Sequence, residues 1–106
     1  DGIIDQDTLG LNRVYIQAKR YAPENAVGRP DIQSFVGALH GQQANQGVFI
    51  TTGRFSSGAV DYAGSVATRV VLIDGQRLAD LMIRYRVGVQ AKRTLHIVEV
   101  DEDFFV

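Results

Sequence analysis

Two polar side chains, Gln17 and Lys19, lie two positions apart within the strand-like run VYIQAKRY. Side chains of a β-strand alternate between its faces, so a strand here places both residues on one face. A glutamine oxygen together with a carboxylate such as Asp1, at the start of a neighbouring strand, could hold a hard cation such as Mg²⁺, which polarises phosphate and activates a bound water. A lysine there could orient that water and stabilise negative charge in the transition state. These residue types suit metal-assisted hydrolysis of a phosphodiester.

Other residues offer alternative ligands or contacts. Asp5 and Asp7 are carboxylates close to Asp1 in sequence, but they lie in a turn-like stretch where aspartate commonly forms Asx-turns, so we favour structural roles. Thr51 and Thr52 end a predicted buried strand, where they could contact phosphate or form a cap or turn. Residue type alone leaves the role of these two threonines open.

Weaker candidates are Gln33 and the histidines. Gln33, in the first turn of a predicted helix, could assist at a catalytic face or be an ordinary surface residue. His40 and His96 do not suggest a metal pair, and we expect a solvated helix end and a strand face, respectively. Solvated strand faces often carry pairs such as Gln17 and Lys19, so spacing alone does not establish a nuclease site.

The elements that position these residues follow from the apolar periodicity, which alternates between strand-like and helix-like segments. GII, RVYIQAK, GVFIT, RVVLI and TLHIVEV are the strand-like or short apolar runs, and GVFIT and RVVLI have the pattern of fully buried strands. DQDTLGLN is a turn or hairpin loop, and RYAPENAVGRP is a loop before the first helix. The helix stripes are Ile32, Phe35, Val36 and Leu39 after Pro30; Ala59, Val60, Ala63 and Val66 after a serine cap; and Leu78, Leu81, Met82 and Tyr85 after an Asp74 cap, ended by Gly88. Strands separated by helices predict a three-layer α/β domain with a mixed sheet.

Composition limits the class of protein. The chain has 106 residues, 45% of them hydrophobic and 22% charged, which is typical of a single globular domain. It has no cysteine, which excludes disulfides and thiolate zinc sites, and no apolar run approaches the roughly 20 residues of a membrane span. We therefore expect an intracellular, cytoplasmic protein. The net charge of -1 gives no general argument for nucleic-acid binding, and the local basic groups are Lys19–Arg20 and the series Arg84, Arg86, Lys92 and Arg93.

The segment DGIIDQDTLGLNRVYIQAKRY resembles the catalytic domain of Mrr-like restriction endonucleases, a branch of the PD-(D/E)xK nuclease superfamily. The resemblance continues through IQSFVGAL, GVFITTGRFSSGAVDYA and VVLIDGQRLADLMI to VDEDFF. By this resemblance, Asp1 matches the family's metal-binding aspartate, and Gln17 with Lys19 matches its Gln-x-Lys motif. Glutamine stands where most of the superfamily has Asp or Glu, so weaker metal binding is expected.

The resemblance implies a restriction-endonuclease-like core over residues 1–106, as a fragment without the family's N-terminal helix and first strand. It also implies hydrolysis of modified, often methylated, foreign double-stranded DNA with Mg²⁺ or Mn²⁺. For the full-length protein we expect a homodimer or larger assembly and no membrane association. The alternatives are a structure-selective resolvase or repair nuclease, and an inactive DNA-binding module.

Overall fold

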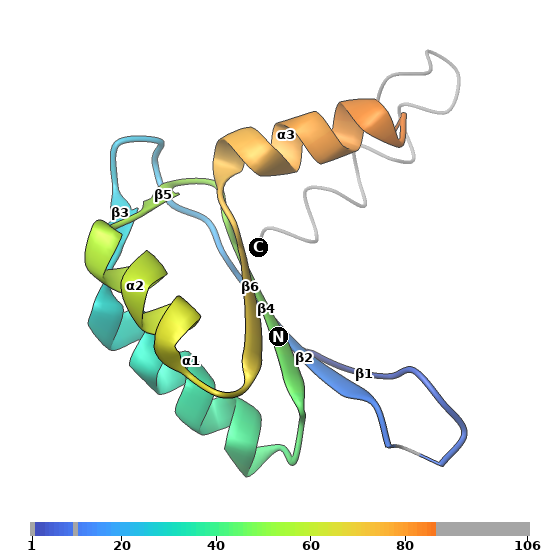
Figure 1. Ribbon diagram of the computed structural model, residues 1–106. Helices are drawn as coiled ribbons and strands as arrows, with labels where there is room; N and C mark the ends of the chain where they lie inside the picture. Colours follow the sequence, from blue (N-terminus) through green and yellow to red (C-terminus); the bar gives the residue numbers. More distant parts are fainter. Residues whose placement is uncertain (1, 10, 87–106) are drawn as a thin grey trace.

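The centre of the structure is a four-stranded mixed sheet. The computed structural model describes residues 2–9 and 11–86. The strands of this sheet, in spatial order, are β1 (Gly2–Asp5), β2 (Arg13–Lys19), β4 (Gln46–Thr51) and β6 (Arg69–Ile73). β1 pairs with β2 antiparallel through a hairpin, whereas the β2–β4 and β4–β6 pairs are parallel (Figure 1). The mixed sheet and the β1–β2 hairpin loop agree with the sequence predictions.

Helices cover the sheet from both sides, which confirms the predicted three-layer α/β architecture. α1 (Arg29–Gly41) and α2 (Ser57–Ser65) lie side by side against one face. α3 (Gly75–Arg84) leaves the carboxyl end of β6 and extends on the opposite side of the sheet (Figure 1). No helix within residues 2–9 and 11–86 is long and apolar enough to cross a membrane.

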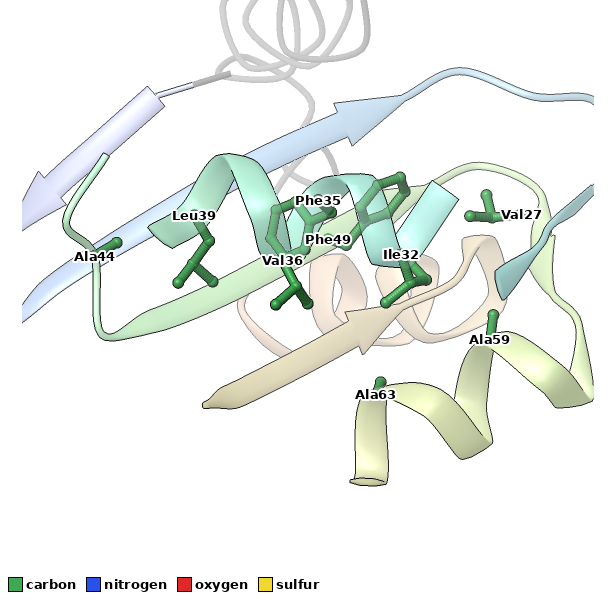
Figure 2. Packing of buried hydrophobic residues seen from close by; sticks show 9 residues of the cluster. All are labelled: Val27, Ile32, Phe35, Val36, Leu39, Ala44, Phe49, Ala59 and Ala63. Carbon is green, nitrogen blue, oxygen red and sulfur yellow. The ribbon is translucent and has the colours of Figure 1, made fainter. Parts of the chain in front are cut away.

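The main core lies between α1 and the sheet. All four predicted residues of the α1 stripe, Ile32, Phe35, Val36 and Leu39, are buried (Figure 2). The Phe35 ring stacks on Tyr15 of β2 at 5.5 Å between centroids and meets Phe49 of β4 edge-on at 5.3 Å. These contacts identify the face of β2 that carries Tyr15 as the face that α1 covers.

Two helices begin at the capping residues that the sequence predicts. Ser56 accepts a hydrogen bond from the Ala59 backbone at 3.1 Å, and Asp74 accepts one from the Arg77 backbone at 2.8 Å. Each cap satisfies a backbone N–H that has no partner inside its helix. The predicted starts of α2 and α3 are therefore confirmed at these residues.

Several predictions at the level of single residues are wrong. Val60 is 53% exposed, because Ala59 takes the inward position on α2 and adjacent helix residues point in different directions. RVVLI forms β6, but β6 is an edge strand in the described sheet and is only half-buried rather than fully buried. Tyr85 is 70% exposed at the C-cap of α3, a helix that buries none of its residues fully. The predicted terminator Gly88 lies outside the described residues.

One small sheet was not predicted. β3 (Ala26–Val27) and β5 (Arg54–Phe55) form a parallel two-stranded pair, with Ala26 opposite Arg54 and Val27 opposite Phe55. β3 lies in the segment that the sequence indicated to be a loop. The predicted strand TLHIVEV, together with His96, lies outside the described residues.

Candidate active site

Gln17 and Lys19 occupy the same face of β2, as their spacing predicts. In the parallel ladder, Gln17 pairs with Phe49 and Lys19 pairs with Thr51 of β4. Both polar side chains are half-buried on the face that carries Tyr15, which is the face covered by α1. Lys19 is the last residue of β2, so it lies at the carboxyl edge of the sheet. Polar residues at this edge are common in α/β binding sites.

Asp1, the predicted carboxylate ligand, lies outside the described residues. Its sequence neighbour Gly2 pairs with Ile16 of β2, the residue before Gln17. The predicted convergence of Asp1, Gln17 and Lys19 therefore stays a prediction. The described residues contribute the Gln17 oxygen and the Lys19 cation to it.

The two aspartates of the β1–β2 hairpin have structural partners. Asp5 forms an ion pair with Arg13 at 2.9 Å, and this hydrogen-bonded carboxylate raises the pKa of the Arg13 guanidinium above its ordinary value. Asp7 accepts a hydrogen bond from the Leu11 backbone at 2.8 Å across the turn. Within residues 2–9 and 11–86, no three His, Cys, Asp or Glu side chains are grouped to hold a metal ion. The structural roles favoured for Asp5 and Asp7 agree with these contacts.

Both threonine hydroxyls at the end of β4 contact backbone atoms. Thr51 is fully buried, and its Oγ1 accepts a hydrogen bond from the Gly53 N–H at 3.0 Å. Thr52 Oγ1 accepts from the Tyr21 N–H at 2.7 Å and donates to the Tyr21 carbonyl at 2.6 Å. The Thr51 contact is a local turn, one of the roles that the sequence left open, whereas Thr52 contacts a residue 31 positions away, a role that the sequence did not predict.

The weaker candidates lie on the surface. His40 is exposed at the last turn of α1, as predicted, and its Nε2 lies 2.9 Å from the Thr68 hydroxyl. Gln33 is exposed on α1. Neither residue has a described contact with Gln17 or Lys19.

Comparison with known protein families matches residues 1–82 to the restriction endonuclease family of Mrr catalytic domains. The chain belongs to this family. It is also 53% identical over 105 residues to the type IV methyl-directed restriction enzyme EcoKMrr of Escherichia coli strain K12, a match that covers 99% of this chain and 33% of that enzyme. The chain thus spans about a third of the length of this relative.

A solved structure confirms the restriction-endonuclease-like fold. The DNA modification-dependent restriction endonuclease AspBHI superposes with a TM-score of 0.66 at 23% identity, over 87% of this chain and 22% of that protein. At this identity the likeness bears on fold alone.

In this Mrr-family domain, the carboxyl edge holds features that sequence reasoning missed. An open hollow of about 550 Å³ lies beside the ends of β4 and β6, lined by Thr52, Arg54, Asp74 and residues of α3. Arg54 and Asp74 also line a second hollow between α2 and β6. In the sequence, Arg54 is a single arginine after TTG, and its spacing from other charged residues has no distinctive pattern.

Proposed function

We propose that this chain is the catalytic part of a DNA endonuclease that restricts modified, methylated foreign DNA by hydrolysing phosphodiester bonds. The observation that carries the proposal is the placement of Gln17 and Lys19 on one half-buried strand face in a chain of the Mrr family. Half-burial matters because a charge on a partly desolvated surface acts on a substrate more strongly than one in open water. The name of the relative EcoKMrr, methyl-directed, supports the class of substrate.

In this proposal, Asp1 and Gln17 hold the metal, which is Mg²⁺ with Mn²⁺ as a substitute. The donor set fits such a hard cation in its chemistry, since both side chains offer oxygen atoms. Among the described residues, the fit to the ion is incomplete. Gln17 supplies one neutral oxygen, and the carboxylates of Asp5 and Asp7 are bonded to Arg13 and Leu11 instead. The pairing of Gly2 with Ile16 supports Asp1 as the missing ligand, because Asp1 is next to Gly2 and Gln17 is next to Ile16. When bound, the ion would polarise the phosphate and lower the pKa of a water.

Lys19 would act on the negative charge that grows on the phosphate oxygens during hydrolysis. Its ammonium is a compact point charge with three donors on a flexible stem, so it can also orient the attacking water. Arg20 follows directly and is exposed, so it is available to a DNA phosphate outside the reacting group. The proposed partner is double-stranded DNA, bound by a homodimer or larger assembly of the full-length protein.

The test is cleavage of methylated and unmethylated DNA by the full-length parent protein. Lys19→Ala should abolish cleavage with Mg²⁺ or Mn²⁺ and leave the circular dichroism spectrum unchanged, because Lys19 ends its strand and is only half-buried. Ca²⁺ should support binding without turnover. The matched control is Arg69→Ala, which removes an exposed cation from the amino end of β6. Cleavage by a folded Lys19→Ala variant at the wild-type rate would reject the assignment.

The same assay separates the alternatives. A structure-selective nuclease would cut branched DNA in preference to a methylated linear duplex. A DNA-binding module without activity would bind DNA and cut none of these substrates with any of the metals.

A further inference from the structure

The backbone at the end of β2 and directly after it is held by Thr52, the residue that follows β4. The Thr52 N–H donates to the Lys19 carbonyl at 3.2 Å, one position beyond the last paired residues of the β2–β4 ladder, Lys19 and Thr51. The Thr52 hydroxyl then both accepts from the Tyr21 N–H and donates to the Tyr21 carbonyl. Thr52 therefore forms hydrogen bonds with the backbone of Lys19 and of Tyr21, the residues on either side of Arg20.

The loop of residues 20–25, which follows Lys19, packs against residues 52–54. A Cβ added to Gly53 would lie 2.5 Å from the Asn25 carbonyl oxygen and 2.9 Å from the Tyr21 Cβ, so the loop contacts Gly53 directly. The Arg54 N–H also donates to the Asn25 carbonyl at 3.0 Å. Residues 20–25 are thus packed and hydrogen-bonded against residues 52–54 rather than free to move with the end of β2.

We propose that Thr52 is a positioning residue for Lys19, acting through the backbone of residues 19–21. This inference rests on the proposed function, because it assumes that the Lys19 ammonium acts in the reaction. A lysine has a long flexible stem, so its ammonium stays in place only if the backbone that carries it is fixed. Without the Thr52 side-chain contacts, the backbone would lose two hydrogen bonds directly after the end of β2 at Lys19. Displacement of a catalytic group by about 1 Å can cost about 100-fold in rate.

Thr52 has the chemistry for this role because a hydroxyl is both a donor and an acceptor. It uses both functions on one residue, Tyr21, which lies 31 positions away in sequence. Valine has nearly the same shape but neither function, so Thr52→Val removes both side-chain contacts and keeps the packing. Serine keeps the hydroxyl, so Thr52→Ser should restore both contacts.

The experiment measures kcat and KM for cleavage of methylated DNA by the full-length parent protein. Thr52→Val should lower kcat by about 10- to 100-fold with KM nearly unchanged, because the reacting step and not DNA binding depends on the place of Lys19. Thr52→Ser should recover most of the lost kcat. The matched control is Thr68→Val, which removes the hydroxyl near His40 Nε2, at the opposite edge of the sheet, and should leave kcat unchanged.

Folding is controlled by scaling each rate to the folded fraction measured by circular dichroism at the assay temperature. A Thr52→Val variant with wild-type kcat per folded molecule, in a protein that Lys19→Ala inactivates, would overturn the positioning role and leave the proposed function intact. A kcat loss that Thr52→Ser fails to recover would also overturn it. Full cleavage by Lys19→Ala would instead reject the proposed function itself.

Discussion

Gln17 brings a neutral oxygen to a place where most of the superfamily that this chain resembles has a carboxylate. If this oxygen is a metal ligand, Gln17→Glu keeps the geometry and adds a negative charge, so the metal should bind more tightly. Gln17→Leu should lose metal binding and cleavage. Calorimetric titration of Mg²⁺ into the full-length protein and its two variants measures these affinities.

The competing role for Gln17 is a hydrogen bond to neighbouring groups on β2, which is common for glutamine. In that case neither substitution changes the affinity for Mg²⁺, and Asp1 remains the only defensible ligand. The cleavage rate of Gln17→Glu is a poor criterion, because added negative charge tightens the ion and also reduces its Lewis acidity and repels the phosphate.

At the residue scale, the sequence predicts partners that are close along the chain and misses those that are distant. The common face of Gln17 and Lys19 follows from the two-residue period of a strand. The Asx role of Asp7 follows from its turn, with a partner four positions away. The role of Thr52 does not follow, because its partner Tyr21 is 31 positions away and the register of β2 with β4 brings them together.

The contact between α1 and the sheet depends on a glycine of β4. A Cβ on Gly47 would lie 2.4 Å from Leu39 Cδ1 and 2.7 Å from Phe35 Cε2, both in the side-chain layer that α1 buries. Gly47→Ala should therefore destabilise the fold by about 1–3 kcal/mol, as overpacking of a core does. Equilibrium urea unfolding measures the change.

The matched control is Gly37→Ala in the exposed part of α1, where an added Cβ meets nothing within 4 Å. This substitution should stabilise the fold by about 0.5–1 kcal/mol, because alanine is the better helix former. Equal effects of the two substitutions on stability would contradict the close packing at Gly47.

The Asp74 cap is a second test at the scale of an element. Asp74→Ala should cost about 1 kcal/mol of stability, because the Arg77 N–H loses its acceptor. Asp74→Asn should retain most of the stability, since asparagine is an equally good cap. Urea midpoints of the two variants decide the point, and a large loss in Asp74→Asn would indicate that the charge rather than the hydrogen bond matters.

At the element scale, the sequence predicts the helices and long strands well because each has a period of its own. β3 and β5 have two residues each, too few to show any period, and their pairing joins residues far apart in sequence. β6 is half-buried and lies at the edge of the sheet that residues 2–9 and 11–86 form. Apolar content alone does not distinguish an edge strand from a central one.

The net charge of this chain bears on how the chain would meet DNA. With a net charge of -1, attraction to phosphates must come from local groups such as Arg20 beside Lys19. Arg20→Ala should weaken binding of the full-length protein to methylated and unmethylated DNA alike and reduce the slope of log K against log salt by about 1. Fluorescence anisotropy at several salt concentrations measures the slope, with Arg69→Ala as the control. An unchanged slope in Arg20→Ala would exclude a phosphate contact at this residue.

At the scale of the molecule, the α/β class follows from alternating strands and helices, but the strand order β1-β2-β4-β6 had to come from the structure. Periodicity shows which residues face inward, but it does not determine which strands pair with each other. The carboxyl edge, where the Thr52 N–H meets the Lys19 carbonyl, is a product of that order.

The parallel pairing of β2 with β4 also sets a sequence of events during synthesis. β1 and its hairpin partner β2 leave the ribosome before α1 and β4 and can pair early, because their contacts are local. The Thr52 contacts at the end of β2 can form only after α1 and then β4 have been synthesised. A nascent chain that stalls before β4 carries Gln17 and Lys19 without the Thr52 contacts, so under the proposed function nuclease activity should arise only after residues 46–52 have folded against β2.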